Sequence, residues 1–306
     1  MRGFVFLILA GPAFAEGPAA PQFVAETEAS GLAHTFAGEW EFVVGGGAAV
    51  FDCSGDGLPE IFMAGGTNPS ALFLNESAGT LAFQKAESSG LEIDTVSGAY
   101  PLDVDADGIT DLAVLRVGAA RLMRGLGACK FKDAGADWGF QPRDLWHTAF
   151  AATWEKGADW PTLAFGSYID RAQEEFPWGN CTENLLYRGT AGRFATPLAL
   201  NPSFCTLSML FTDWSRSGTP ALRVSNDREY YKGGQEQLWH IEPGAEPRLY
   251  TEAEGWKRLR IWGMGIASRD LNDDGYPEYF LTSMADNKLQ VLKDPKSAKA
   301  DYADIA

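Results

Sequence analysis

A nine-residue pattern recurs along this chain, with starting points separated by 51, 51, 59 and 57 residues. Three copies are nearly complete: DCSGDGLPE from Asp52, DVDADGITD from Asp103 and DLNDDGYPE from Asp270. Each carries an oxygen-bearing side chain at positions 1, 3, 5 and 9 and a glycine at position 6. Two weaker copies, WEKGADWPT from Trp154 and DWSRSGTPA from Asp213, keep the spacing and a proline at position 8. A period of this length is typical of one propeller blade.

Short apolar runs flank each copy of the pattern. AAVF precedes the first copy and IFMA follows it, and a third run, ALFLN, begins at Ala71. A fourth element opens with an aromatic residue and closes on glycine, as from Phe83 to Gly90. Four short strands per unit with glycine-rich turns predict an all-β chain of four-stranded antiparallel blades, with five repeats visible. A stacked solenoid is the structural alternative, although solenoid periods are usually shorter.

The aspartates of the pattern predict calcium sites. Ca²⁺ takes six to eight oxygen ligands, and alternate residues of a tight loop turn their oxygens to one side. The expected ligands are the side chains at positions 1, 3, 5 and 9 and the carbonyl at position 7. In the three strong copies these residues are Asp52, Ser54, Asp56, Leu58 and Glu60; Asp103, Asp105, Asp107, Ile109 and Asp111; and Asp270, Asn272, Asp274, Tyr276 and Glu278.

Other interpretations of the pattern fit these residues less well. A single such string usually forms a polar turn rich in Asp and Gly, but three copies at blade spacing disfavour that interpretation. Mg²⁺ prefers to keep water and strict octahedral geometry, and Zn²⁺ prefers His and Cys ligands. The Trp154 copy lacks ligands at positions 1, 3 and 5, and the Asp213 copy has a single carboxylate. We therefore expect about three calcium ions and two metal-free loops.

The pattern D-x-[DNS]-x-D-G-x-x-[DE] between two strands resembles the FG-GAP/VCBS repeat. The segment from Phe23 to Leu32, followed by GGGAAVFDCSGDGLPEIF, is similar to bacterial relatives of cartilage acidic protein. The resemblance implies a calcium-loaded β-propeller, usually seven-bladed as in the integrin α-subunit head, which serves extracellular adhesion or ligand binding. It covers roughly residues 22–292, with 293–306 as a polar tail or a truncated next blade. Five repeats indicate a five-bladed ring or, as we favour, a truncated larger one.

The N-terminus and the cysteines predict a non-cytoplasmic protein. Residues 1–15 read as a signal peptide, with Arg2, an apolar stretch and an Ala13-Phe14-Ala15 cleavage site, followed by a linker at 16–21. We expect a secreted or periplasmic chain without a membrane span after cleavage. In an oxidising compartment the four cysteines should pair. Of three possible connectivities we favour Cys181 with Cys205, which leaves Cys53 with Cys129.

Composition limits the function. The formal charge of −16 repels phosphate backbones, so nucleic acid is excluded as a partner. We expect a non-catalytic module that binds an unidentified protein or glycan. The candidate binding residues combine paired aromatics with charges in one long segment: Asp227, Arg228, Glu229, Tyr230 and Tyr231. An ordinary hairpin is the alternative for that segment. A polysaccharide-acting enzyme using the propeller channel and a structural repeat region of a larger secreted assembly are the alternative functions.

Overall fold

The computed structural model describes residues 20–173, 179–227 and 234–305. The expected signal peptide and most of the expected linker lie outside these residues. The described chain contains 21 strands and two short 3-10 turns, η1 (Trp40–Phe42) and η2 (Glu252–Glu254). No helix in it is long and apolar enough to cross a membrane. The predicted all-β class is confirmed.

The strands form five successive antiparallel units, which we call blades 1 to 5. Blade 1 contains β1 (Ala48–Phe51), β2 (Glu60–Met63), β3 (Ala71–Asn75) and β4 (Phe83–Lys85). Blade 2 contains β5 (Val96–Leu102), β6 (Asp111–Ala119), β7 (Arg121–Gly125) and β8 (Phe131–Asp133). Blade 3 contains β9 (Asp144–Thr153), β10 (Thr162–Ser167), β11 (Asn184–Thr190), β12 (Arg193–Phe194) and β13 (Leu198–Leu200). Blade 4 contains β14 (Thr206–Thr212), β15 (Ala221–Asn226), β16 (Gln237–His240) and β17 (Arg248–Leu249). Blade 5 contains β18 (Gly263–Arg269), β19 (Glu278–Ser283), β20 (Lys288–Leu292) and β21 (Tyr302–Asp304).

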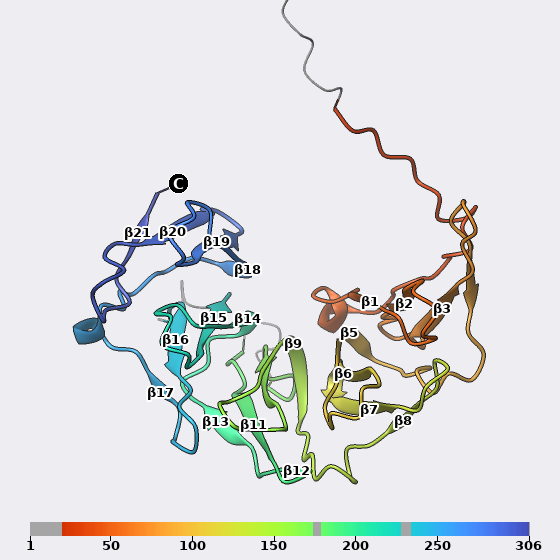
Figure 1. Ribbon diagram of the computed structural model, residues 1–306, viewed down its shortest axis with the longest axis horizontal. Helices are drawn as coiled ribbons and strands as arrows, with labels where there is room; N and C mark the ends of the chain where they lie inside the picture. Colours follow the sequence, from red (N-terminus) through yellow and green to blue (C-terminus); the bar gives the residue numbers. More distant parts are fainter. Residues whose placement is uncertain (1–19, 174–178, 228–233, 306) are drawn as a thin grey trace, which may run out of the picture.

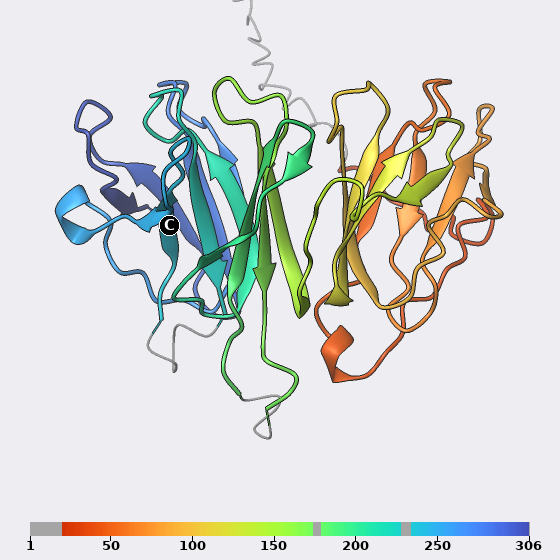
Figure 2. The ribbon, with the colours of Figure 1, turned by 90° about the horizontal axis from the view of Figure 1, so that it is seen from below.

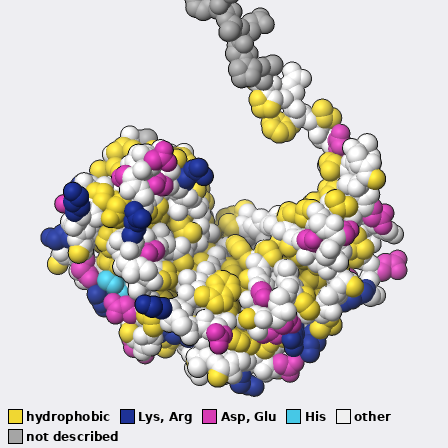
Figure 3. Space-filling view, in the orientation of Figure 1, with side chains coloured by type: hydrophobic (Ala, Val, Ile, Leu, Met, Phe, Trp, Pro, Cys, Tyr) yellow, Lys and Arg dark blue, Asp and Glu magenta, His cyan; other side chains and the backbone are white. Residues whose placement is uncertain are grey.

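The blades follow one another around a common axis, with the first strand of each innermost (Figure 1). They stand side by side with their strand-connecting loops at two opposite rims (Figure 2). The arc is open between blade 5 and blade 1, and the space-filling view shows this opening as a wide notch (Figure 3). This arrangement is a β-propeller, as the sequence predicted, with blades 1, 4 and 5 as separate four-stranded antiparallel sheets and blades 2 and 3 joined into one sheet by pairing of β6 with β9.

The hydrophobic core lies between the blades, because alternate residues of a strand face opposite sides of its sheet. On β6, Leu112 and Val114 pack toward blade 1, beside Phe62. Their neighbours Ala113 and Leu115 pack toward blade 3. Similar clusters lie between blades 3 and 4 and between blades 4 and 5. Each central blade is therefore buried on both faces, which holds the connecting loops of neighbouring blades in fixed relative positions.

A repeated joint ties blade 1 to blade 2, blade 2 to blade 3, and blade 4 to blade 5. The carbonyl of Ser89, after β4, accepts a hydrogen bond from the N–H of Phe131 in blade 2, at 2.8 Å. The next residue, Gly90, has φ of +89°, and a Cβ there would lie 2.1 Å from the Phe131 carbonyl oxygen. Equivalent bonds run from Phe83 to Ser30, from Phe194 to Trp138 and from Ala300 to Glu254. The glycine that closes the fourth element is therefore required by close backbone contact.

The N-terminal segment around Phe23 has the same spacing between an aromatic residue and a glycine as β8 and the turn after it. Phe131 begins β8 eight residues before Gly139, and Phe23 stands eight residues before Gly31. Phe131 is 6% exposed between blades, whereas Phe23 is 92% exposed. Residues 23–25 thus correspond in sequence spacing to an outer strand, although no described strand pairs with them. In Figure 1 this segment leaves the outer rim of blade 1 beside the opening.

Both disulfides join neighbouring blades, and both predicted pairings are confirmed. Cys53, two residues after the end of β1, is bonded to Cys129 in the turn between β7 and β8, which links blades 1 and 2. Cys181, before β11, is bonded to Cys205, directly before β14, which links blades 3 and 4. The bonds therefore reinforce contacts between blades.

The last blade extends beyond the boundary that the sequence indicated. Residues 293–306, expected as a polar tail or the start of a further blade, contain β21. This strand pairs with β20 through Leu292 opposite Tyr302, and the Tyr302 ring packs edge-on against Trp256 and Tyr279. Blade 5 is thereby completed as a four-stranded sheet that ends at Asp304.

Candidate metal centre

The five copies of the pattern occupy one equivalent place in the fold. Each joins the first strand of its blade to the second, and we name each after its blade. The blade-1 loop is 52–60, the blade-2 loop 103–111, the blade-3 loop 154–162, the blade-4 loop 213–221 and the blade-5 loop 270–278. Because equivalent strands run in the same direction, all five loops lie on the same rim (Figure 2). The expected calcium ligands of blades 1 and 2 are thus on neighbouring blades.

The five loops share one left-handed turn, and four of them share a second. Position 4 has φ in the left-handed region in every copy, including the non-glycine residues Ala106, Arg216 and Asp273. The glycine at position 6 is left-handed in four copies, with φ between 79° and 86°. The sequence indicated the turn at position 6 and missed the one at position 4, because residues other than glycine occupy it in three copies. Two left-handed residues so close together curl the loop around its centre.

Carboxylates at positions 1 and 5 shape the loop through backbone hydrogen bonds. Position 1 accepts the N–H of position 6, at 2.9 Å in Asp52, 3.0 Å in Asp103 and 2.8 Å in Asp270. Position 5 accepts the N–H of position 7, at 2.8 to 2.9 Å from Asp56, Asp107 and Asp274. At position 3 of the blade-1 loop, Ser54 donates its hydroxyl to Asp52. The predicted metal ligation by the carbonyls of Leu58, Ile109 and Tyr276 stays a prediction.

The acid at position 9 closes each strong loop from inside the blade. Glu60, Asp111 and Glu278 are buried and accept the N–H of position 2 at 2.7, 2.8 and 2.7 Å. Asp111 also accepts the N–H of Gly125 at 2.8 Å, which fastens the loop to β7. Burial raises the pKa of Asp111 to about 6, although the two backbone bonds oppose the shift. This negative charge therefore lacks full compensation, which a cation would supply.

Two of the loops gather carboxylate oxygens into a cage. Asp52, Asp56 and Glu60 each place an oxygen within 4.8 Å of the others, and so do Asp103, Asp105 and Asp111. In the blade-2 loop, Oδ1 of Asp103 and Oδ1 of Asp105 are buried without a hydrogen-bond partner. Burial and the neighbouring Asp107 and Asp103 raise the pKa of Asp105. Oxygens about 2.3–2.6 Å from one Ca²⁺ would have this spacing, so the residues fit the ion.

The blade-5 loop differs in its third ligand position. The side-chain amide of Asn272 donates to Oε1 of Glu278 at 3.0 Å, while its oxygen accepts the N–H of Asp274 at 2.9 Å. Among the described residues this loop does not bring three carboxylate oxygens within the 4.8 Å separation found in blades 1 and 2. The predicted ligands Asp270, Asn272, Asp274 and Glu278 are nevertheless arranged around one loop.

The blade-3 and blade-4 loops lack an acid at position 9 and are held by other hydrogen bonds. In blade 3, Glu155 at position 2 accepts the hydroxyl of Thr162 at position 9 and Nε of Arg188, both at 2.7 Å. In blade 4, Asp213 accepts the N–H groups of Ser217 and Gly218 at 2.9 and 2.8 Å. The sequence reasoning missed the Glu155–Arg188 pair, because the two residues are neighbours only across paired strands.

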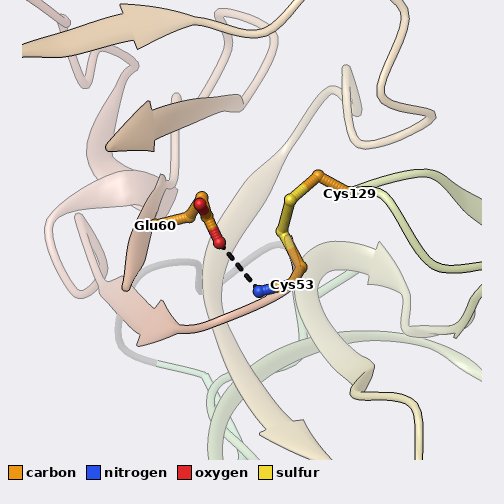
Figure 4. A group of neighbouring side chains, drawn as sticks. All are labelled: Cys53, Glu60 and Cys129. Atoms are coloured by element: carbon orange, nitrogen blue, oxygen red, sulfur yellow. Dashed lines mark hydrogen bonds between the residues drawn. A yellow bond between two sulfur atoms is a disulfide. The ribbon is translucent and has the colours of Figure 1, made fainter. Parts of the chain in front are cut away.

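A further group of neighbouring side chains consists of Cys53, Glu60 and Cys129 (Figure 4). Both sulfurs are in the disulfide, so they offer no thiolate to a metal. Glu60 points at the backbone N–H of Cys53, 2.7 Å from it. Glu60, the closing acid of the blade-1 loop, is thus hydrogen-bonded to the cysteine whose disulfide links blade 1 to blade 2.

The candidate partner segment is described in part. Arg228, Glu229, Tyr230 and Tyr231 lie outside the described residues. Asp227 is 7% exposed, and its carboxylate accepts a hydrogen bond from the Tyr168 hydroxyl. It therefore anchors the start of the segment. The end of β15 and the start of β16, between which the segment falls in the sequence, lie at the rim opposite the aspartate loops.

The three histidines have separate, structural surroundings. His34 contacts the Ala64 carbonyl, and His240 stacks on Tyr250 beside Glu254. His147 is 1% exposed and lies 3.3 Å from the hydroxyl of Ser167, which is itself fully buried. Burial lowers the pKa of His147 to about 4, so it is neutral at physiological pH. The histidines are thus kept apart by the fold.

Comparison with known proteins identifies the repeat. Residues 52–114, which hold the blade-1 and blade-2 loops, match the family described as FG-GAP-like repeat. The sequence-based resemblance is confirmed at that level, whereas the similarity to relatives of cartilage acidic protein stays a prediction. No curated protein sequence matches the chain.

The chain is also similar to two solved structures. One is BBS1N in complex with ARL6DN, at a TM-score of 0.48 and 13% identity over 84% of this chain and 64% of that one. The other is an Agrocybe aegerita lectin whose structure concerns recognition of non-reducing terminal N-acetylglucosamine, at a TM-score of 0.46 and 14% identity, with coverages of 84% and 64%. The chain thus spans just under two thirds of the length of each.

Proposed function

We propose, from the FG-GAP-like repeat at residues 52–114 and the geometry of its loops, that this protein is a calcium-stabilised, non-catalytic binding propeller. It would work in a secreted or periplasmic setting. The observation that carries the calcium assignment is the pair of buried, unpartnered carboxylate oxygens in the blade-2 loop. Buried charge without a partner is costly unless a counter-charge is supplied.

The calcium ions would act on stability. In blades 1 and 2 the ligands come from residues that begin and end the connection between the two innermost strands. An ion bound by Asp103, Asp105 and Asp111 would offset the mutual repulsion of these carboxylates and fix both strand ends. Because an ion that binds only the folded chain stabilises it by mass action, removal of calcium should lower the melting temperature.

The compartment is inferred from the disulfides. Structural disulfides form and persist where the environment is oxidising. All four cysteines of the chain are paired, and both bonds cross from one blade to the next. With the signal peptide expected at 1–15, this supports export from the cytoplasm.

A binding role is favoured over catalysis. The patterned carboxylates are engaged in loop hydrogen bonds, and His147 and Ser167 are sealed from solvent. β15 ends and β16 begins at the rim opposite the aspartate loops, and the expected binding residues Tyr230 and Tyr231 fall between these strands in the sequence. Aromatic side chains among charges suit contact with a protein or a glycan.

A binding screen tests the proposed role. The mature protein is applied to a glycan array and to intact bacterial surfaces, with calcium and with EGTA, alongside a variant carrying Tyr230→Ala and Tyr231→Ala. Saturable binding that this variant loses while its melting temperature is unchanged supports the proposal. Turnover of a polysaccharide panel by the wild-type protein, abolished by substitution of a carboxylate facing the central axis, would overturn the non-catalytic assignment.

A further inference from the structure

Arg124 extends over the blade-2 loop from the end of β7. Its Nη2 lies 2.9 Å from Oδ2 of Asp105 and 2.8 Å from Oδ2 of Asp107. Asp105 is the more enclosed partner, with 11% of its side chain exposed. The hydrogen bond from Arg124 lowers the pKa of Asp107. A positive side chain is therefore already in contact with two of the four carboxylates of this loop.

Strand register explains why the guanidinium reaches this loop. Leu112 pairs with Met123, so the closing residue Asp111 stands opposite Arg124 on the neighbouring strand. The same register in blade 1 pairs Ile61 with Phe73, which places Leu74 opposite Glu60. In blade 5, Val291 stands opposite Glu278. The other two strong loops thus have an apolar residue at the place that Arg124 occupies.

Arg124 binds the outer oxygens of the cage and leaves the inner ones free. It contacts Oδ2 of Asp105, whereas Oδ1 of the same carboxylate is buried without a partner, like Oδ1 of Asp103. The guanidinium and an ion inside the cage would therefore share one carboxylate from opposite sides. Two cations so close repel each other, and the repulsion is weakened by solvent at the partly exposed guanidinium.

The positive charge of Arg124 offsets an additional carboxylate in the blade-2 loop. The blade-1 loop has three carboxylates at these positions, Asp52, Asp56 and Glu60, and the blade-5 loop also has three. The blade-2 loop has four, because Asp105 stands where the other loops have Ser54 and Asn272. With Arg124 included, the blade-2 cage has the same net charge of −3 as the other two (−4 + 1 = −3).

Blade 3 also has an arginine opposite position 9 of its loop, although this loop lacks acidic side chains at positions 1, 3 and 5. Thr162 pairs with Arg188, so Arg188 has the register of Arg124. Its Nε binds Glu155 inside the loop, and its other nitrogens bind carbonyl oxygens of Glu242 and Ala245 in blade 4. In both blades that have an arginine at this register, its guanidinium therefore contacts a carboxylate of the loop.

We propose that Arg124 is a built-in counter-ion of the blade-2 calcium site. It holds Asp105 and Asp107 together when calcium is absent, and it lowers the affinity of the loop for calcium. The blade-2 loop, despite having the most carboxylates, then carries no more net negative charge in the absence of calcium than the other two strong loops. This inference rests on the proposed calcium-binding function, and Arg124 acts as a positioning residue outside the ligand set.

The test uses Arg124→Gln in a full-length chain that also carries Asp56→Asn and Asp274→Asn, so that the blade-2 loop is the remaining strong site. Calcium affinity is measured by isothermal titration calorimetry, and melting temperature is measured in EGTA. We expect Arg124→Gln to tighten calcium binding about tenfold, which follows from losing one positive charge near the ion. In EGTA it should lower the melting temperature by about 2 to 4 °C. Arg121→Gln, on the same strand and paired with exposed Asp133 at 3.9 Å, is the matched control and should change neither.

The outcomes separate the two proposals. If the parent chain binds calcium and Arg124→Gln leaves the affinity unchanged or weaker, the counter-ion inference is overturned and the calcium-binding function stands. If neither the parent chain nor the wild type binds calcium, the proposed calcium-binding function is wrong, and so is the proposed effect of Arg124 on calcium affinity. A melting temperature in EGTA that Arg124→Gln raises would contradict the stabilising role of the arginine independently of calcium.

Discussion

Substitution of Asp111 separates the structural role of the closing acid from its role as a ligand. Its side chain is fully buried and accepts the N–H groups of Val104 and Gly125, both at 2.8 Å. Asp111→Ala leaves two buried donors unpaired, at about 1–3 kcal/mol each. Removal of a carboxylate whose pKa burial has raised to about 6 offsets part of this loss at pH 7. We expect a net loss of about 2–4 kcal/mol in EGTA.

The assay is urea unfolding of wild type, Asp111→Ala and a surface control, each in EGTA and in calcium. Asp137→Ala is the control, because its carboxylate is 71% exposed and lies 3.5 Å from the ammonium of exposed Lys132. The control should stay within about 0.5 kcal/mol of wild type. Calcium at about 100 times its dissociation constant adds about 2.7 kcal/mol per intact site, and Asp111→Ala should lose one such increment.

Two results would refute this reasoning. An Asp111→Ala variant as stable in EGTA as Asp137→Ala would show that the carboxylate does not hold the loop to β7. An undiminished calcium increment in Asp111→Ala would show that the carboxylate is not a ligand. Asp111→Asn, which keeps one acceptor oxygen, should lose the calcium increment with a smaller cost in EGTA.

Three further predictions concern proton binding, the disulfide and the repeated joint. The pKa of Asp111 in the folded state is raised from 3.8 to about 6, so the folded state binds a proton here more readily than the unfolded state does. In EGTA, the free energy of unfolding should therefore gain from this group as pH falls from 7 toward 4. The difference in melting temperature between wild type and Asp111→Asn, measured over this pH range, should show the gain. Calcium binding should weaken over the same range, since protons compete for the ligand. Replacing Cys53 and Cys129 together by serine removes a link across 76 residues and should cost about 2–5 kcal/mol in urea unfolding, a result contradicted by an unchanged midpoint. Phe131→Ala should cost about 3–5 kcal/mol, whereas Phe23→Ala at the exposed position should stay within about 0.5 kcal/mol; equal losses would contradict this difference and show that Phe23 is packed as Phe131 is.

Sequence reasoning succeeded where the physical constraint is local. Oxygen ligands on alternate residues and a glycine that permits positive φ are properties of nine consecutive residues, so the loops around Asp52, Asp103 and Asp270 were found directly. Their repetition at blade spacing predicted the five repeats, and the cysteine spacing favoured the observed disulfides. The aromatic-to-glycine element was also visible, although its cause, the close approach of Gly90 to Phe131, required the structure.

What the sequence did not disclose depends on register and on neighbouring blades. Arg124 meets Asp105 because β6 and β7 pair with one particular offset, and no local pattern fixes that offset. The pairing of Glu155 with Arg188 is hidden for the same reason. Residues 302–304 read as part of a polar tail, yet Tyr302 belongs to a strand because Trp256 and Tyr279 receive its ring. The burial of Asp227 likewise follows from Tyr168 on the preceding blade.

The number of calcium ions bound per chain tests the central claim most directly. Metal-free mature protein is dialysed to equilibrium against saturating calcium, and bound ions are counted by elemental analysis. The account predicts about three ions per wild-type chain and one fewer after Asp103→Asn with Asp105→Asn, with a lower melting temperature once EGTA is added. A wild-type chain that retains no calcium, or a count unchanged by the double substitution, would contradict it.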